Sequence, residues 1–246
     1  MIKSLIGKGL RRFGYRLSRV PTNDFQPNPR IDEQDVAESL AVIQRATQNS
    51  SDCMTWERSR RYFNPGRVNF YYGVLKVLEE ANLLGKDSRV LDVGVYFGYM
   101  LRILHKFHPQ SNYFGTETHE TRIAIAKELC PWATLWHSTI DELDSAQRYD
   151  VALLTEVLEH MVDPADAVHK LARVADVLLL SVPDGRLDTT EAMQFNAEWG
   201  SYRGHVNFWS PESWQYWLEK ELPNHLIQTG ILPTHKLYAL VRQKQS

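Results

Sequence analysis

The stretch "VLDVGVYFGYML", residues 90–101, decides the fold of this chain. Its first residues have the apolar character of a buried strand, and Asp92 ends the apolar run. Gly94 and Gly98 then flank a turn into a helical pattern, and glycine permits both unusual backbone angles and the close approach of a ligand. In sheets built from such strand–turn–helix units, ligands bind beyond the carboxyl ends of the strands. We therefore expect the main functional signature here.

Strands and helices alternate on both sides of this stretch. Apolar runs alternate with amphipathic helical patterns, which predicts an α/β fold with a mostly parallel sheet covered by helices on both faces. The last two runs are expected to form a hairpin that gives one edge antiparallel character. The expected strands cover residues 89–95, 112–117, 133–139, 149–157, 176–183, 226–232 and 236–243, and the expected helices cover residues 31–48, 68–85, 98–107, 119–129, 163–175 and 210–222.

The composition is that of an ordinary globular protein, with 246 residues, 43% of them hydrophobic and 24% charged. This length fits one large domain or one domain with extensions. The net charge of −2 gives no reason to expect nucleic acid as a partner. Cys53 and Cys130 match no zinc spacing, so we interpret them as reduced thiols in a cytoplasmic protein, with a disulfide between them as the alternative. The longest apolar runs are too short to span a membrane.

The N-terminal segment, residues 1–22, differs from everything after it. Its apolar side chains share one broad helical face, its lysines and arginines lie mostly on the other, and the first acidic residue is Asp24. This pattern predicts a basic amphipathic helix in peripheral contact with an anionic membrane through residues 1–20. A helix docked on the protein or a partner subunit, and a transit peptide, are alternatives. Residues 23–63 are expected to form a helical extension and residues 64–246 the main domain.

Four segments follow one another in an order typical of one enzyme family. They are "VLDVGVYFG" from residue 90, "FGTE" from residue 114, "YDVALLTEVLEHMVDP" from residue 149 and "LLLSVPD" from residue 178. Over residues 64–242 the chain resembles class I S-adenosylmethionine-dependent methyltransferases, in particular the branch with bacterial polysaccharide, small-molecule and quinone-type O-methyltransferases. This resemblance implies a Rossmann-like seven-stranded sheet with an antiparallel last strand, S-adenosyl-L-methionine as cofactor, and methyl transfer as the reaction.

The expected cofactor site joins residues from the sheet pattern with residues that the resemblance implies. Glu117 ends the second strand, where one carboxylate can accept hydrogen bonds from both ribose hydroxyls. The segment "NPGR" at residues 64–67 resembles the "NPxR" of quinone-biosynthesis O-methyltransferases, which implies that Arg67 pairs with the methionine carboxylate. A surface ion pair is the alternative for Arg67. The full expected set is Arg67, Asp92, Gly94, Tyr96, Gly98, Glu117, Thr118, Thr139, Ile140 and Thr155.

Two positions depart from the family pattern. Tyr96 stands in place of the middle glycine of the first motif, where a side chain would either crowd or cover the cofactor. Thr139 stands where the family often has an aspartate that contacts the adenine amino group, with Asp141 two residues further on. These departures motivate one hypothesis of another class, a binding or scaffold protein with a degraded cofactor site.

The segment "LTEVLEHMVDP", residues 154–164, carries the candidate catalytic residues. Glu156, Glu159 and His160 share one face if the segment is helical. Three interpretations remain open. The residues hold the loop and its helix together; or His160 or His205 is the general base for a substrate hydroxyl, with Glu156 beside it; or the three residues and His205 hold a divalent metal, as in the small-RNA 3′-terminal ribose methyltransferases with a similar set.

The methyl acceptor is expected to be a hydroxyl on a glycan, a lipid-linked compound or another small molecule. Aromatic residues after the fifth strand occupy the region where the family builds its substrate cover, and they either stack on a sugar, line a lipid groove or pack the insertion; they are Phe195, Trp199, Tyr202 and Trp209. The basic N-terminal segment favours a cytoplasmic enzyme at the membrane face. A quinone or phenol O-methyltransferase is the alternative.

Overall fold

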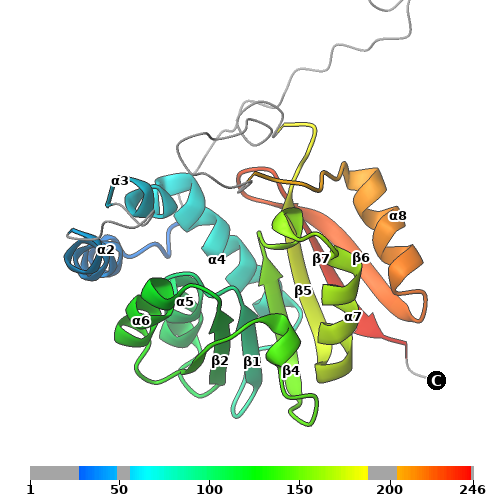
Figure 1. The fold of residues 1–246 in the computed structure, drawn as a ribbon, viewed down its shortest axis with the longest axis horizontal. Helices are drawn as coiled ribbons and strands as arrows, with labels where there is room; N and C mark the ends of the chain where they lie inside the picture. The colour runs from blue at the N-terminus through cyan, green and yellow to red at the C-terminus, as the bar shows by residue number, and fades with distance from the viewer. Residues whose placement is uncertain (1–27, 49–55, 188–203, 245–246) are drawn as a thin grey trace, which may run out of the picture.

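The computed structural model describes residues 28–48, 56–187 and 204–244 (Figure 1). The basic N-terminal segment, Cys53, and the aromatic residues Phe195, Trp199 and Tyr202 lie outside the described residues. The expectations for them remain predictions. Among the helices that the structure describes, none is long and apolar enough to cross a bilayer.

Seven strands form one sheet in the order β3-β2-β1-β4-β5-β7-β6. The first five are parallel, and β7 runs antiparallel to both β5 and β6. The predicted α/β, Rossmann-like fold is therefore confirmed. The strands are β1 (Arg89–Val93), β2 (Asn112–Glu117), β3 (Thr134–His137), β4 (Tyr149–Thr155), β5 (Ala175–Pro183), β6 (His225–Leu232) and β7 (Lys236–Gln243).

Helices cover both faces of the sheet, as Figure 1 shows. One hydrophobic core lies between the sheet and α4 (Pro65–Glu80), α5 (Tyr99–Phe107) and α6 (Glu120–Leu129). The other lies between the sheet and α7 (Pro164–Val174) and α8 (Pro211–Glu221). The central strands are buried on both faces, which explains why they read as continuous apolar runs in the sequence.

Local signals set where these helices begin. The side chain of Asn64 accepts a hydrogen bond from the backbone N–H of Arg67 (2.9 Å) and caps α4. Pro164 lies in the first turn of α7, and Ser210 caps α8 by accepting from the N–H of Ser213 (3.2 Å). The cap at α4 bears on function because it fixes the helix turn that carries Arg67.

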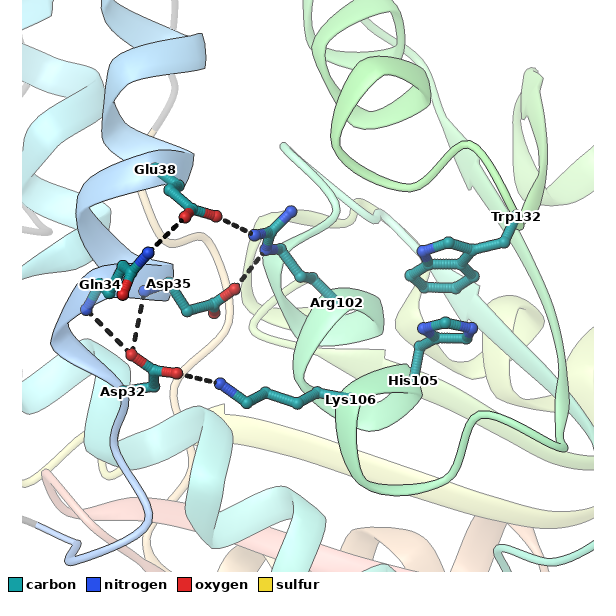
Figure 2. Close-up of a pocket in the computed structure, with 8 residues that line it drawn as sticks. All are labelled: Asp32, Gln34, Asp35, Glu38, Arg102, His105, Lys106 and Trp132. Atoms are coloured by element: carbon teal, nitrogen blue, oxygen red, sulfur yellow. Dashed lines mark hydrogen bonds and ion pairs between the residues drawn. The ribbon is translucent and has the colours of Figure 1, made fainter.

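The described part of the N-terminal extension packs against the main domain. It consists of α2 (Glu33–Thr47), α3 (Trp56–Ser59) and the 3-10 turn Arg60–Phe63. Figure 2 shows the seam between α2 and α5, where Asp35 contacts Arg102 at 2.6 Å and Asp32 contacts Lys106. A polar, open pocket of about 390 Å³ lies along the seam beside Trp132. Its acids and bases pair with one another, so the seam fixes α2 on α5.

Candidate active site

The turn after β1 depends on its two glycines. Both Gly94 and Gly98 have φ of +81°, a left-handed conformation that favours glycine. A Cβ atom on Gly94 would lie 2.9 Å from Cγ2 of Val157, which follows β4, so a side chain at position 94 would clash with Val157. The N–H of Gly94 donates to the carbonyl of Thr116 over 2.8 Å. The turn is thus fixed between the ends of β2 and β4, at the edge where cofactors bind in this fold.

Tyr96 takes the left-handed conformation with φ of 54°, although it is not glycine. Such a conformation costs a non-glycine residue about 1–2 kcal/mol, so surrounding contacts must hold it. Its ring centroid lies 4.1 Å from that of Tyr62 and 4.0 Å from that of Phe97, and the guanidinium of Arg122 lies 4.7 Å from its centroid. Its side chain therefore joins the glycine turn to the N-terminal extension.

Glu117 lies at the tip of β2 with its side chain buried. Its Oε2 accepts from the N–H of Tyr96 (3.1 Å), its Oε1 accepts from the N–H of His119 (3.0 Å), and Arg122 lies 3.6 Å from Oε1. The hydroxyl of the exposed Thr118 also lies 3.4 Å from Oε1. A carboxylate offers about four acceptor positions. The two backbone N–H groups take two of these positions and orient the carboxylate. The contacts with Arg122 (3.6 Å) and Thr118 (3.4 Å) are long, so a pair of ligand hydroxyls could replace them.

Asp92 is buried beneath this turn, one strand away from Glu117. Burial raises the pKa of Asp92 to about 7, and the negative charge of Glu117 adds to the rise. Register places Asp92 opposite Gly115, where a Cβ atom would lie 3.0 Å from the carbonyl oxygen of Asp92. The chain at this point is too tightly packed for a larger residue.

The remaining expected cofactor residues lie at the ends of β3 and β4. The backbone N–H of Thr139 donates to Oε2 of Glu142 (2.7 Å) and its hydroxyl lies 3.2 Å from the same oxygen, so the side chain caps the 3-10 turn Ile140–Glu142. Ile140 packs against the core beneath α7. Thr155 ends β4 opposite Ser181. Thr139, which stands where the family often has an adenine-binding aspartate, therefore makes its hydrogen bonds within the 3-10 turn that follows it.

Glu156 adopts a left-handed conformation with φ of 58° directly after β4. Its Oε2 lies 2.6 Å from Nζ of Lys236 and 3.5 Å from Nη1 of Arg67, and its Oε1 lies 3.3 Å from the hydroxyl of Ser181. Arg67 also lies over the ring of Tyr62, at 5.2 Å from the centroid. Lys236 was not identified from the sequence, because it follows Glu156 by 80 residues and belongs to no motif. The expected catalytic residue Glu156 is thus neutralised by two cations.

Glu159, His160 and His205 form a second cluster. Among the described residues their side chains bring one ligand atom each within 4.8 Å of one another. Oε1 of the buried Glu159 lies 3.9 Å from Nε2 of His160 and 4.0 Å from Nε2 of His205. Burial raises the pKa of Glu159 well above its usual range, and Glu156 raises it further. Glu156 is not a member of this cluster, because the turn is 3-10 from Leu158 to His160 and does not extend the helical spacing back to Glu156.

A backbone clamp brings His205 to this place. The carbonyl of Glu159 accepts from the N–H groups of Val206 (2.8 Å) and Asn207 (3.1 Å). The amide of Asn207 donates to the carbonyls of Leu158 (3.1 Å) and Met161 (2.6 Å). Asn207 was not identified from the sequence, because the amide serves the backbone of a segment about 46 residues earlier in the chain. Trp209, expected as part of the substrate cover, is buried and packs against Trp214 and Trp217.

Three solved methyltransferase structures share this fold. The plantazolicin methyltransferase BpumL, solved with SAH and a desmethylPZN analog, is 15% identical with a TM-score of 0.65, over 87% of this chain and 100% of that one. Magnesium protoporphyrin IX methyltransferase (ChlM) from Synechocystis PCC 6803, solved with SAH, is 17% identical with a TM-score of 0.58, over 86% and 97%. The methyltransferase domain of bacterial CtHen1-C is 17% identical with a TM-score of 0.57, over 72% and 98%. The SAH bound to the first two agrees with the expected cofactor.

Among curated proteins, none matches the sequence. One family profile, described as a methyltransferase domain, matches residues 61–221, which is more than half of the chain. The expected enzyme class is therefore confirmed, and the chain belongs to this family of methyltransferase domains.

Proposed function

We propose that the protein transfers a methyl group from S-adenosylmethionine to a hydroxyl, with His160 or His205 as the general base. The observation that carries this proposal is the cluster of both histidines with the buried Glu159, directly beyond β4. Imidazole titrates near neutral pH and can accept the proton of an alcohol as the oxygen attacks. The rings lie 4.7 Å apart, so both can reach one acceptor group.

The residues around the glycine turn fit the cofactor. Glu117 has acceptor capacity for a ribose, Gly94 exposes backbone rather than a side chain, and Arg67 lies beside the same turn of chain as Glu156. The cofactor supplies an electrophilic methyl group. The protein orients that group toward the acceptor oxygen. Holding the two reacting atoms in line lowers the barrier to the displacement.

Apolar side chains around the histidines support an acceptor with an apolar part. Val162 is 98% exposed, Val206 50% and Phe208 39%, and the ring of Phe208 lies 6.3 Å from that of His205. A hydroxyl on a lipid-linked or glycan compound at the cytoplasmic membrane face suits this surface and the basic segment at residues 1–20. A quinone or phenol suits the apolar surface equally and is the alternative methyl acceptor.

A divalent metal is a second candidate for the histidine cluster. One carboxylate oxygen and two imidazole nitrogens within 4.8 Å of one another match the donor types that Zn²⁺ and Mn²⁺ accept. A metal would require Glu159 to lose its proton, so ion binding would release protons. In this alternative the ion would polarise the acceptor hydroxyl in place of a histidine base.

The test is methyl transfer from labelled S-adenosylmethionine to matched acceptors. We expect label in long-chain alcohols, glycolipids or phenols and none in the corresponding amines. Label in amines alone would contradict the proposed O-methylation. Absence of cofactor binding in calorimetry would instead favour the scaffold hypothesis that Tyr96 and Thr139 motivated.

A further inference from the structure

We infer that Lys236 is a positioning residue for the amino-acid end of the cofactor: by holding Glu156, it leaves Arg67 available to bind a carboxylate. This inference rests on the proposed use of S-adenosylmethionine. It concerns a residue from the opposite end of the chain that no motif includes.

Two cations compete for one oxygen of Glu156. Lys236 Nζ lies 2.6 Å from Oε2, the distance of a strong charge-assisted hydrogen bond, whereas Arg67 Nη1 lies 3.5 Å away, at the outer limit of a hydrogen bond. The side chain of Glu156 is 8% exposed, so its charge needs a close partner. Lys236 fills that role, and the guanidinium of Arg67 keeps only a long contact with Glu156.

The backbone places Lys236 as firmly as it places Glu156. The N–H of Glu156 donates to the carbonyl of Ser181 over 2.9 Å. Lys236 begins β7 and pairs in register with Pro183 on one side and Leu232 on the other. The two preceding residues, Thr234 and His235, both have positive φ. This turn is tight and fixed by two neighbouring strands.

The same turn packs against the helix that carries Arg67. A Cβ atom on Gly66 would lie 2.9 Å from Cγ2 of Thr234, and one on Gly73 would lie 2.6 Å from Cδ of Pro233. Glycine at both positions lets α4 approach the turn. The helix that carries Arg67 and the turn that precedes Lys236 therefore pack directly against one another, and both cations reach Glu156 from this contact.

The charges leave a demand for one anion. Arg67, Lys236 and Glu156 carry two positive charges and one negative charge. Glu159 also interacts with these cations, but burial raises its pKa well above the usual range, which favours its uncharged form. A single carboxylate, such as that of the methionine moiety, would balance them. Without the charge of Lys236, Glu156 would draw Arg67 into a one-to-one pair, and the attraction for a carboxylate would disappear.

The test compares two cofactor products by calorimetry. S-adenosylhomocysteine contains the amino-acid end, and 5′-methylthioadenosine lacks it. We expect Lys236→Met to weaken S-adenosylhomocysteine at least tenfold and to change 5′-methylthioadenosine less than twofold, which also verifies that the variant is folded. Lys236→Arg should keep most of the affinity, and Lys220→Met, an exposed lysine on α8, should change neither.

A double variant separates positioning from direct contact. Adding Glu156→Gln to Lys236→Met removes the charge that would trap Arg67, so it should restore S-adenosylhomocysteine binding. Equal affinity of wild type and Lys236→Met, equal loss for both compounds, or no rescue in the double variant would each overturn the inference. If wild type binds neither compound, the proposed cofactor itself is wrong, which is a distinct result.

Discussion

The backbone N–H of Tyr96 donates to Oε2 of Glu117 over 3.1 Å, so the residue that replaces a family glycine also orients the acid expected to bind ribose. Tyr96 contributes only its backbone N–H to this bond, so a glycine at this position would make it too. The ring of Tyr96 packs against Tyr62, which comes from the N-terminal extension. The departure from the glycine pattern therefore adds a contact to the extension while it preserves the hydrogen bond to Glu117.

Glu117→Ala is expected to weaken S-adenosylhomocysteine at least tenfold. Hydrogen bonds to a charged group contribute about 1.5–3 kcal/mol each, and a ribose would make two of them. Calorimetry measures the dissociation constant, with Glu120→Ala on the exposed start of α6 as the matched control. An unchanged constant in folded Glu117→Ala would remove Glu117 from the site.

Asp92→Asn is expected to raise the melting temperature more at pH 8 than at pH 5. The pKa of Asp92 is about 7 in the folded protein and near 3.8 when unfolded, because burial disfavours its charge. Between these values the folded state holds a proton that the unfolded state has lost, so the stability of the wild type falls as pH rises toward 7. Asparagine carries no such charge.

The measurement is thermal unfolding of wild type and Asp92→Asn across that pH range. Asp176→Asn, at an exposed position of β5, is the control. A difference between wild type and Asp92→Asn that stays constant from pH 5 to pH 8 would show that Asp92 carries no proton into the folded state.

Most of the fold follows from the sequence, because burial imposes a readable pattern. Central strands such as β4 and β5 must be apolar throughout, and the cap at Ser210 and the proline at position 164 mark helix starts. The strand ends were predicted less well. The apolar pattern was read to residue 157, but β4 ends at Thr155 because Glu156 turns into the left-handed region.

The arrangement of the candidate site followed from the sequence only in part. The spacing of Glu156, Glu159 and His160 predicts a shared face only in a continuous helix, and the observed 3-10 turn separates Glu156 from the other two. The contact between Glu156 and Lys236 depends on the strand order β5-β7-β6, which brings residues 80 positions apart together. No local pattern encodes such a pairing.

Removal of residues 1–23 is expected to abolish binding to anionic vesicles, if the basic segment acts at a membrane. Lysine and arginine near an anionic surface contribute about 1 kcal/mol each, and salt screens this attraction. The measurement is co-sedimentation of the full chain and of a chain that begins at Asp24, at low and high salt. Equal binding of both proteins would contradict the membrane prediction and favour a helix docked on protein.

The histidine cluster allows three outcomes that one set of assays separates. If His160 or His205 is the base, its replacement by alanine should lower kcat by about 10²–10⁴ while cofactor affinity stays nearly unchanged, and the pH profile should lose its acidic limb. If the cluster binds a metal, EDTA should abolish methyl transfer and added Mn²⁺ or Zn²⁺ should restore it. If the residues are structural, activity should fall only in step with the folded fraction, with a melting temperature lowered by several degrees.

A catalytic role and a structural role for the histidines predict opposite orders of effect. The clamp that fixes this region uses the backbone carbonyl of Glu159 and the amide of Asn207. His160 is 44% exposed and faces the buried Glu159 carboxyl. Asn207→Ala should therefore cost more stability than His160→Ala, whereas His160→Ala should cost more activity per folded molecule. The reverse order in thermal unfolding and product formation would assign the cluster to structure.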